Sequence, residues 1–332
     1  MTEFQSIGVL GAGAWGTALA QTARKAGRDV VLWAYEFETV TDINDYHQNR
    51  IFLPGVDLDR AIRATAKLAD VAACDAILLV TPTQFTRDIT LELAPHLAET
   101  CPLVICSKGI EQKSRKLLAG VVAETVGAAP IAVLSGPSFA AEVARGLPAA
   151  VTLACADEKL GMALAHAIGH TGFRPYWSDD IIGVQVGGAV KNVLAIAAGI
   201  VLGKAMGASA HAALITRGFG EIVRLGEALG ARSETLMGLS GLGDLMLTCS
   251  SPQSRNMSLG RALGEGQSLD DVLGSRKSVS EGVFTAAALA EMAADLKLDL
   301  PICQSVHAIV SGAMGVDEVI EDLLSRPLQH EV

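Results

Sequence analysis

The sequence predicts an α/β fold class, in which a doubly wound, mostly parallel sheet is followed by an all-helical region. Three observations support this prediction. A glycine-rich segment at 11–16 (GAGAWG) joins a short apolar run to an alanine-rich run. Strand-like and helix-like segments alternate over roughly the first 175 residues, as in proteins with a parallel sheet. From Ile181 onward, only helix-like segments follow.

The glycine-rich segment has the spacing G-x-G-x-x-G between a predicted strand at 7–10 and a predicted helix at 17–26. In this pattern Gly11 permits a tight turn, Gly13 lets a pyrophosphate approach the backbone, and Gly16 lets the helix pack closely on the strand. The N–H groups at the start of the helix then face the phosphates. The alternative is a purely structural turn. The position between a strand and a helix favours dinucleotide binding.

The remaining elements of the first half follow from short apolar runs and from helical periodicity. The predicted strands lie at 29–34, 62–65, 75–80, 102–107, 131–134, 149–154 and 173–177, and the predicted helices at 36–49, 84–97, 139–145 and 158–169. A turn is expected at 53–55 (LPG). Ser138 is expected to cap the helix that follows it.

The second half is predicted to be helical, with helices at 184–202, 208–229, 285–296 and 302–314 and a glycine-rich loop at 238–244. The change of pattern near Asp180 predicts two domains, a nucleotide-binding domain at 1–180 and a substrate domain at 181–332.

Composition limits the class of protein. The chain has 332 residues, half of them hydrophobic, and a formal net charge of −10. This charge disfavours nucleic acid as the main partner, whereas a small anionic substrate needs only a few local cations. No signal peptide is recognisable, and Lys191 and Asn192 interrupt the most apolar stretch. We therefore expect a cytoplasmic protein without an integral membrane segment.

The six cysteines form no C-x-x-C pair, which predicts reduced thiols in the core. His166 and His170, like Cys303 and His307, are four residues apart and would share a helix face. No further ligand lies at a suitable spacing, so no metal site is expected.

Lys191 is the strongest single candidate for chemistry, because it interrupts an apolar helix just after Gly187 and Gly188. Burial lowers the pKa of a lysine and makes it a proton acceptor near neutral pH. The alternative is a lysine that extends to the surface from the edge of the helix.

Other polar residues have two interpretations. Lys108 follows a strand, at the sheet edge where ligands bind or where a loop lysine is simply solvated. Asp244 either orients Lys191 or a substrate hydroxyl, or caps the next helix. Ser254, Arg255 and Asn256 suit a phosphate, or a capped and solvated helix start.

Ordered motifs along nearly the whole chain resemble the bacterial type of the NAD(P)-dependent glycerol-3-phosphate dehydrogenase family. They are GAGAWGTALA at 11–20, NRIFLPG at 49–55, SKGI at 107–110, SGPSFAAEVA at 135–144, GGAVKNVLAIAAG at 187–199 and GLGDLMLTCSSPQSRN at 241–256. The resemblance implies a Rossmann domain followed by a helical domain like that of 6-phosphogluconate dehydrogenase.

The resemblance also implies reversible hydride transfer between sn-glycerol 3-phosphate and dihydroxyacetone phosphate with NAD or NADP, a reaction that supplies glycerol 3-phosphate for phospholipid synthesis. It makes Lys191 the acceptor of the C2 hydroxyl proton. The substrate residues that it implies are Lys108, Gly136, Ser138, Lys191, Asp244, Ser254, Arg255 and Asn256. The cofactor residues that it implies are Gly11, Gly13, Ala14, Trp15, Gly16, Tyr35, Phe85, Lys108, Ala140, Arg255, Val279 and Glu281. Relatives are commonly dimeric, which makes a homodimer possible.

One position departs from the family pattern in a way that concerns the cofactor. Many bacterial relatives carry Arg or His where Tyr35 stands, and a basic residue there would pair with the ribose phosphate of NADP. Tyr35, with Glu36 beside it, shifts the expectation towards NAD. Ala14 replaces a common Ser, at a contact that the backbone can make.

Two other assignments fit part of the pattern. One is a sister dehydrogenase of the same plan that acts on 6-phosphogluconate or a 3-hydroxyacyl-CoA. UDP-sugar dehydrogenases are disfavoured because no cysteine lies beside Lys191 in the sequence. The other is a non-catalytic nucleotide sensor, which would have no need of the Lys191 proton acceptor.

Overall fold

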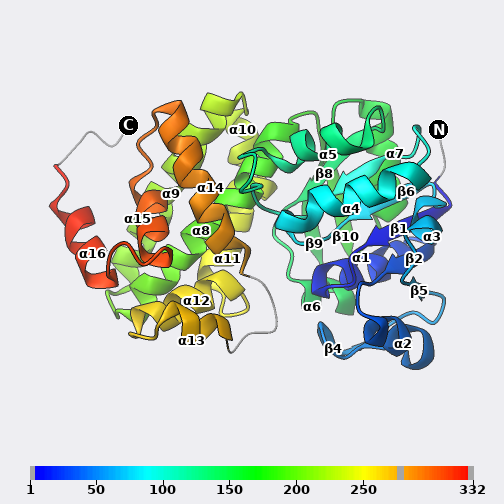
Figure 1. Cartoon of the computed structure of the whole chain (residues 1–332), viewed down its shortest axis with the longest axis horizontal. Helices are drawn as coiled ribbons and strands as arrows, with labels where there is room; N and C mark the ends of the chain where they lie inside the picture. The colour runs from blue at the N-terminus through cyan, green and yellow to red at the C-terminus, as the bar shows by residue number, and fades with distance from the viewer. Residues whose placement is uncertain (1–3, 275–279, 328–332) are drawn as a thin grey trace.

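The computed structural model describes residues 4–274 and 280–327, with a sheet-containing N-terminal half beside a helical C-terminal half (Figure 1). The main sheet has eight strands in the order β10-β9-β8-β7-β6-β1-β2-β5. Their bounds are β1 Ser6–Leu10, β2 Asp29–Trp33, β5 Arg63–Thr65, β6 Ala76–Leu79, β7 Leu103–Ile105, β8 Ile131–Ser135, β9 Ala149–Cys155 and β10 Phe173–Ser178. All neighbours pair in parallel except β8 and β9. The predicted doubly wound, mostly parallel sheet is confirmed.

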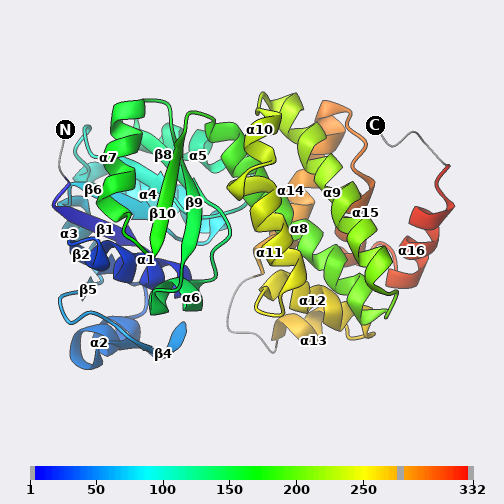
Figure 2. The same cartoon turned by 180° about the vertical axis from the view of Figure 1, so that it is seen from behind.

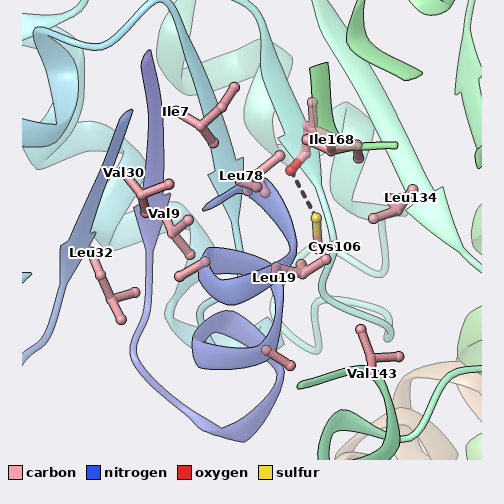
Figure 3. Packing of buried hydrophobic residues seen from close by; sticks show 14 of the residues in the cluster. Ile7, Val9, Leu19, Val30, Leu32, Leu78, Cys106, Leu134, Val143 and Ile168 are labelled. Carbon is pink, nitrogen blue, oxygen red and sulfur yellow. Dashed lines mark hydrogen bonds between the residues drawn. The ribbon is translucent and has the colours of Figure 1, made fainter. Parts of the chain in front are cut away.

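The sheet is buried on both faces, which explains the continuous apolar runs of its strands. On one face, Ile7, Val9, Leu32 and Leu78 from the strands pack with Leu19 from helix α1 (Ala14–Lys25), as Figure 3 shows. The helices of this half are α2 Phe37–Tyr46, α3 Leu68–Ala72, α4 Thr86–Leu93, α5 Leu118–Val126, α6 Ala140–Arg145 and α7 Glu158–Ile168, with short 3-10 turns η1 Thr83–Phe85 and η2 Ala94–His96.

The order of the strands reverses at β1, and the carboxyl edge of the sheet beside β1 is therefore where a ligand crevice is expected. From β1 the chain first builds β2 and β5 on one side, then β6 and β7 on the other. Open α/β sheets bind ligands at such a reversal of strand order. Gly11 lies there, and a Cβ at this residue would be 2.9 Å from the carbonyl oxygen of Val80 on the neighbouring strand connection.

The C-terminal half is built around helix α8 (Ile181–Gly203), whose residues are buried along most of its length. The helix is long and apolar enough to cross a membrane, but 89% of its most apolar window is buried inside the structure, as in the core helix of a soluble protein. The other helices are α9 Ala208–Leu229, α10 Ser233–Leu236, α11 Asp244–Ser250, α12 Arg255–Gly264, α13 Leu269–Gly274, α14 Glu281–Leu296, α15 Pro301–Val310 and α16 Val316–Ser325. Figure 2 shows α8 behind α9 and α11.

Glycines let α12 lie directly against α8. A Cβ at Gly260 would overlap the carbonyl oxygen of Ile196, and one at Gly199 would overlap that of Met257. The two backbones are therefore in contact, which agrees with the small residues of the predicted helix at 184–202.

The two halves share a core and polar contacts. Ile110, from the loop after β7, is fully buried among the side chains of the helical half. In the same loop, Arg115 forms ion pairs with Glu291 and Asp295 of α14.

Several boundaries differ from the predictions. The helix predicted at 36–49 ends at Tyr46, because His47 adopts a left-handed conformation and 48–49 form strand β3. The turn predicted at 53–55 lies within β4 (Leu53–Asp57), which pairs with β3. The helix predicted at 302–314 ends at Val310, ahead of Gly312 with φ of 74°.

Two local predictions were wrong for reasons visible in the structure. The segment 238–244 is not a loop, because Leu239–Gly243 forms a π-type turn (η3) that leads into α11. Its Gly241 packs against the backbone of Leu236, so this glycine serves close packing. Ser138 does not cap α6, because its hydroxyl donates to the Gly136 carbonyl oxygen at 3.0 Å.

Candidate functional site

The glycine-rich turn has the geometry that a dinucleotide requires. Gly11 has φ of 121°, and a Cβ at Gly16 would overlap the Gly11 carbonyl oxygen. By contrast, nothing lies within 4 Å of a Cβ built at Gly13, and no side chain caps the first turn of α1. Open space beside uncapped helix N–H groups fits a pyrophosphate.

The other residues predicted for the cofactor surround this turn or lie along the crevice. Ala14 and Trp15 open α1, and Ala140 opens α6, a helix that packs against α1. Tyr35 follows β2 and is 83% exposed, with its ring edge-on to Trp33 at 6.3 Å between centroids. Glu36, beside it, is exposed at the start of α2.

Phe85 and Glu281 lie on opposite sides of the boundary between the halves. Phe85 ends η1 and is 60% exposed. Glu281 begins α14, and its Oε1 accepts a hydrogen bond of 3.1 Å from the backbone N–H of Thr83 in η1. Burial raises the pKa of this carboxyl group, although the Thr83 bonds and Arg255 oppose the rise. Val279, also predicted for the cofactor, lies outside the described residues.

Lys191, Asp244 and Lys108 meet where α8, α11 and the end of β7 converge. The Nζ of Lys191 donates to Oδ1 of Asp244 at 2.6 Å, and the Nζ of Lys108 donates to Oδ2 of the same carboxylate at 2.7 Å. Lys108 also donates to the Gly136 carbonyl oxygen at 3.1 Å. The structure thus brings together four residues predicted for the substrate, and Ser138 bonds to the same Gly136 oxygen.

Burial and charge act in opposite directions on the two central groups of this cluster. Lys191 and Asp244 are only 7% and 1% exposed. Burial, together with the Lys108 ammonium, lowers the pKa of Lys191 to about 8, and the Asp244 carboxylate keeps it from falling further. Burial opposes ionisation of Asp244, but the ammonium groups of Lys108 and Lys191 outweigh it and hold its pKa below the ordinary value. Lys191 is therefore a buried amine that loses its proton near physiological pH.

Thr248 belongs to this cluster and was missed by the sequence predictions. Its Oγ1 accepts from the Nζ of Lys191 at 3.0 Å and donates to the Asp244 carbonyl oxygen at 2.6 Å. Asp244 and Thr248 share a face of α11 because they are four residues apart on a helix. That signal was present in the sequence, but the glycines before Asp244 led to the prediction of a loop.

The Ser254–Asn256 segment forms the start of α12, which packs along α8. The Ser254 hydroxyl caps the helix by accepting from the Met257 N–H at 3.2 Å. The side chain of Asn256 accepts from the Gly282 N–H at 3.2 Å, and a Cβ at Gly282 would also be 2.6 Å from the carbonyl oxygen of Asn192. The helix start is capped, as one alternative held, but Ser254 and Asn256 are buried rather than solvated.

The cysteines agree with the prediction of reduced thiols. All six are unpaired and buried. His166 and His170 do not share the helix face that their spacing allows, because α7 ends at Ile168 and His170 lies in the turn before β10.

Comparisons with known proteins agree over nearly the whole chain. Residues 6–161 match the family described as NAD-dependent glycerol-3-phosphate dehydrogenase N-terminus, and residues 180–321 match the corresponding C-terminus. A glycerol-3-phosphate dehydrogenase (NAD(P)+) from Parvibaculum lavamentivorans is 60% identical over 99% of this chain and 98% of its own length. One from Caulobacter vibrioides is 58% identical over 99% of each chain.

A solved structure shows the same likeness. The crystal structure of glycerol-3-phosphate dehydrogenase from Coxiella burnetii superposes with a TM-score of 0.94 and 37% sequence identity, over 98% of this chain and 99% of that one. Family, fold and the geometry of the crevice therefore agree, and the chain belongs to the NAD-dependent glycerol-3-phosphate dehydrogenase family.

Proposed function

We propose that this protein catalyses reversible, NAD(P)-dependent hydride transfer between sn-glycerol 3-phosphate and dihydroxyacetone phosphate. The observation that carries the proposal is the buried Lys191, held by Asp244 at the boundary between the dinucleotide turn and the helical half. A sensor would have no need of a buried amine with a pKa of about 8. The match of both family regions favours this substrate over those of sister dehydrogenases.

In the proposed mechanism, Lys191 moves a proton at the C2 oxygen of the substrate. Its neutral form accepts the hydroxyl proton during oxidation, and its ammonium form returns one to the carbonyl oxygen during reduction. Asp244 and Thr248 fix the position of the amine, and Lys108 adds positive charge beside the same carboxylate. A nicotinamide cofactor supplies the hydride acceptor or donor when it is bound.

The substrate phosphate is proposed to dock at Ser254–Asn256. The N-terminus of α12 carries a partial positive charge, and Arg255 adds a guanidinium that can hold a phosphate through two parallel hydrogen bonds. We further propose that residues 1–180 hold the cofactor and residues 181–332 the substrate. Substitutions in the glycine-rich turn of residues 1–180 should then raise the Kd for the cofactor. Substitutions at 254–256 should raise the KM for the phosphorylated substrate.

Lys191→Met tests the catalytic proposal. The variant should bind NADH with normal affinity, measured by fluorescence, and should lose turnover of dihydroxyacetone phosphate. The matched control is Lys204→Met at the end of the same helix, where the ammonium instead pairs with Asp317 at the surface. Near-normal turnover of Lys191→Met would refute the role of Lys191, and tight cofactor binding by a wild-type protein without turnover would favour the sensor.

NAD is proposed as the preferred cofactor. The residues after β2 are Tyr35 and the exposed carboxylate of Glu36, and an acidic residue at this position binds ribose hydroxyls. Arg50, which follows α2 in the chain, is engaged by both carboxylate oxygens of Asp42. Rates with NADH and NADPH in parallel test this, and Tyr35→Arg should raise kcat/KM for NADPH. A wild-type preference for NADPH would refute it.

The remaining expectations concern the cellular setting. We propose a cytoplasmic homodimer that supplies glycerol 3-phosphate for phospholipid synthesis. Light scattering during gel filtration tests the oligomeric state, since one chain has a mass of 34.4 kDa. A species of single-chain mass at micromolar concentration would refute the dimer.

A further inference from the structure

A pocket of about 340 Å³ lies between helix α7 and strand β10, at the edge of the main sheet. Figure 2 shows these two elements side by side on the face opposite that of Figure 1. We call it the α7–β10 pocket. Its residues contribute nothing to the Lys191 cluster or to the glycine-rich turn. The volume falls at the lower end of the range typical of small-molecule sites.

The polar side chains that line this pocket favour an anion. His166, His170 and Arg174 are among the lining residues, and no carboxylate is. Two further basic residues lie close by. Arg28 donates to the Ala167 carbonyl oxygen at the end of α7 at 3.2 Å, and the Lys25 ammonium is near enough to His170 to act on its pKa. Arg174, Arg28 and Lys25 thus place three cations around a pocket without a lining carboxylate, in a chain with a net charge of −10.

His170 is a lining residue of the pocket, and its ring leaves one hydrogen-bond donor unused. Its Nδ1 accepts from the Gly172 N–H at 3.1 Å, so in the neutral ring Nε2 carries the proton. Burial, assisted by Lys25, lowers the pKa of this imidazole and favours that neutral ring. Nε2 is shielded from solvent and has no partner among the described residues. An unsatisfied buried donor of this kind is costly unless a ligand or an ordered water pairs with it.

Arg174 and the apolar lining supply the rest of a recognition site. The Nε of Arg174 donates to the Tyr176 hydroxyl at 3.3 Å, and the guanidinium carbon lies 5.9 Å from the Tyr176 ring centroid. The rest of the planar donor group has no carboxylate partner in the described part of the chain. Met162 and Tyr176 stay 40% and 50% exposed at the pocket. Large apolar side chains that remain exposed beside a fixed cation are typical of a binding surface.

We propose that the α7–β10 pocket binds a small organic anion with an apolar body, such as an aromatic or short-chain carboxylate. The apolar body contacts Met162 and Tyr176, and the anionic group pairs with Arg174 and the free donor of His170. A compact inorganic anion would leave the apolar side chains of the pocket exposed to water. A neutral apolar ligand would leave the donors of Arg174 and His170 without a partner. The site is independent of the dehydrogenase reaction proposed above.

Ligand-detected NMR on the full chain tests the proposal, with sodium benzoate and sodium octanoate as probes and saturating NAD⁺ to block the dinucleotide crevice. We expect binding of at least one carboxylate with a Kd on the order of 1 mM, and much weaker binding of benzyl alcohol and 1-octanol. Arg174→Gln should raise the Kd about five-fold or more. The matched control is Arg217→Gln, an exposed arginine on α9, which should leave the Kd unchanged.

A second pair of variants separates loss of the site from loss of the fold. Met162→Glu places a negative charge at an exposed rim position and should abolish carboxylate binding, whereas Met162→Leu should preserve it. Both should retain wild-type dehydrogenase rates, so a failure here is distinguishable from a failure of the proposed reaction. The proposal is overturned by equal affinity in Arg174→Gln and wild type, by displacement of the probe with NADH, or by the absence of binding at about 10 mM.

Discussion

Replacing Asp244 with Asn should lower the pKa of Lys191. The carboxylate lies 2.6 Å from the Nζ of the buried Lys191 and 2.7 Å from that of the partly exposed Lys108, so the change removes the negative charge that both ammonium groups share. Burial and Lys108 then continue to disfavour the charged form of Lys191, with no attraction to limit them.

The size of the effect follows from the distances. At an effective dielectric constant of about 20, each pair has a gross attraction of roughly 6 kcal/mol. Much of this offsets the cost of burying the charges, and breaking a buried pair typically costs about 3–5 kcal/mol of stability. Because one pKa unit corresponds to about 1.4 kcal/mol, a loss of about 3–5 kcal/mol corresponds to a fall of about 2–4 units in the pKa of Lys191 from its value of about 8.

The assay is the pH dependence of kcat/KM for oxidation of glycerol 3-phosphate, which reports the free enzyme's base. The lower limb of the wild-type profile should have a midpoint near 8, and that of Asp244→Asn should lie at a lower pH with a reduced plateau. Thr248→Val is the matched control, because it removes a hydrogen bond of 3.0 Å to Lys191 but keeps the charge pair. An unchanged midpoint in Asp244→Asn, or a rise, would refute the reasoning.

A stability measurement provides a second readout that needs no turnover. The pKa of Lys191 is about 8 in the folded state against an ordinary 10.5, so the folded state binds fewer protons between these values. The Lys191 side chain therefore lowers the stability of the fold least above pH 10.5, where it is neutral in both states, and most below pH 8, where the folded protein must bury its charge. Relative to Lys191→Met, wild type should gain about 3 kcal/mol across this window in chemical denaturation. A difference that is independent of pH would contradict the lowered pKa.

Three further predictions concern stability and cofactor binding. Glu221→Ala should lower the free energy of unfolding by about 3–5 kcal/mol, because this buried side chain on α9 accepts from two N–H groups at the start of α15. Glu227, which is also on α9, is exposed, so Glu227→Ala should lower it by less than about 1 kcal/mol. Gly260→Ala should cost about 2–4 kcal/mol by forcing α12 off α8, as measured by urea denaturation. By the same measurement, Gly220→Ala should stabilise by about 0.5–1 kcal/mol, because a Cβ there would make only an ordinary contact of 3.6 Å with the flexible Arg224 side chain. Gly13→Ala should leave the melting temperature unchanged and raise the Kd for NADH about ten-fold or more in a fluorescence titration, because only a ligand fills the space beside it; an unchanged Kd would contradict the pyrophosphate site.

Local patterns explain why much of the fold was predictable. The strands β1, β6 and β7 are continuous apolar runs because both faces of the sheet are covered, and the turn at 11–16 has its spacing because backbone approach fixes each glycine. Lys191 was predictable as a buried lysine because no other charge interrupts its apolar helix.

Features that depend on distant partners were not predictable in the same way. Glycine occurs both in flexible loops and at close packing contacts, so the sequence predicted a loop before Asp244. Without a predicted helix from Asp244 onward, nothing placed Thr248 on the same helix face as Asp244. The bond from Thr83 to Glu281 joins residues 198 positions apart. No periodicity in either segment specifies such a contact.

The burial of α8 has a consequence for how the chain folds during synthesis. This helix leaves the ribosome well before α12, whose glycine face covers it and which is complete only about sixty residues later. At translation rates of about 5–20 residues per second, the apolar helix α8 is synthesised several seconds before α12. Until α12 is made, α8 is covered by the sheet half, including Ile110, and by α9 and α11, which are made after it. Because the sheet half is made first, part of the surface that covers α8 is already complete when this helix is synthesised.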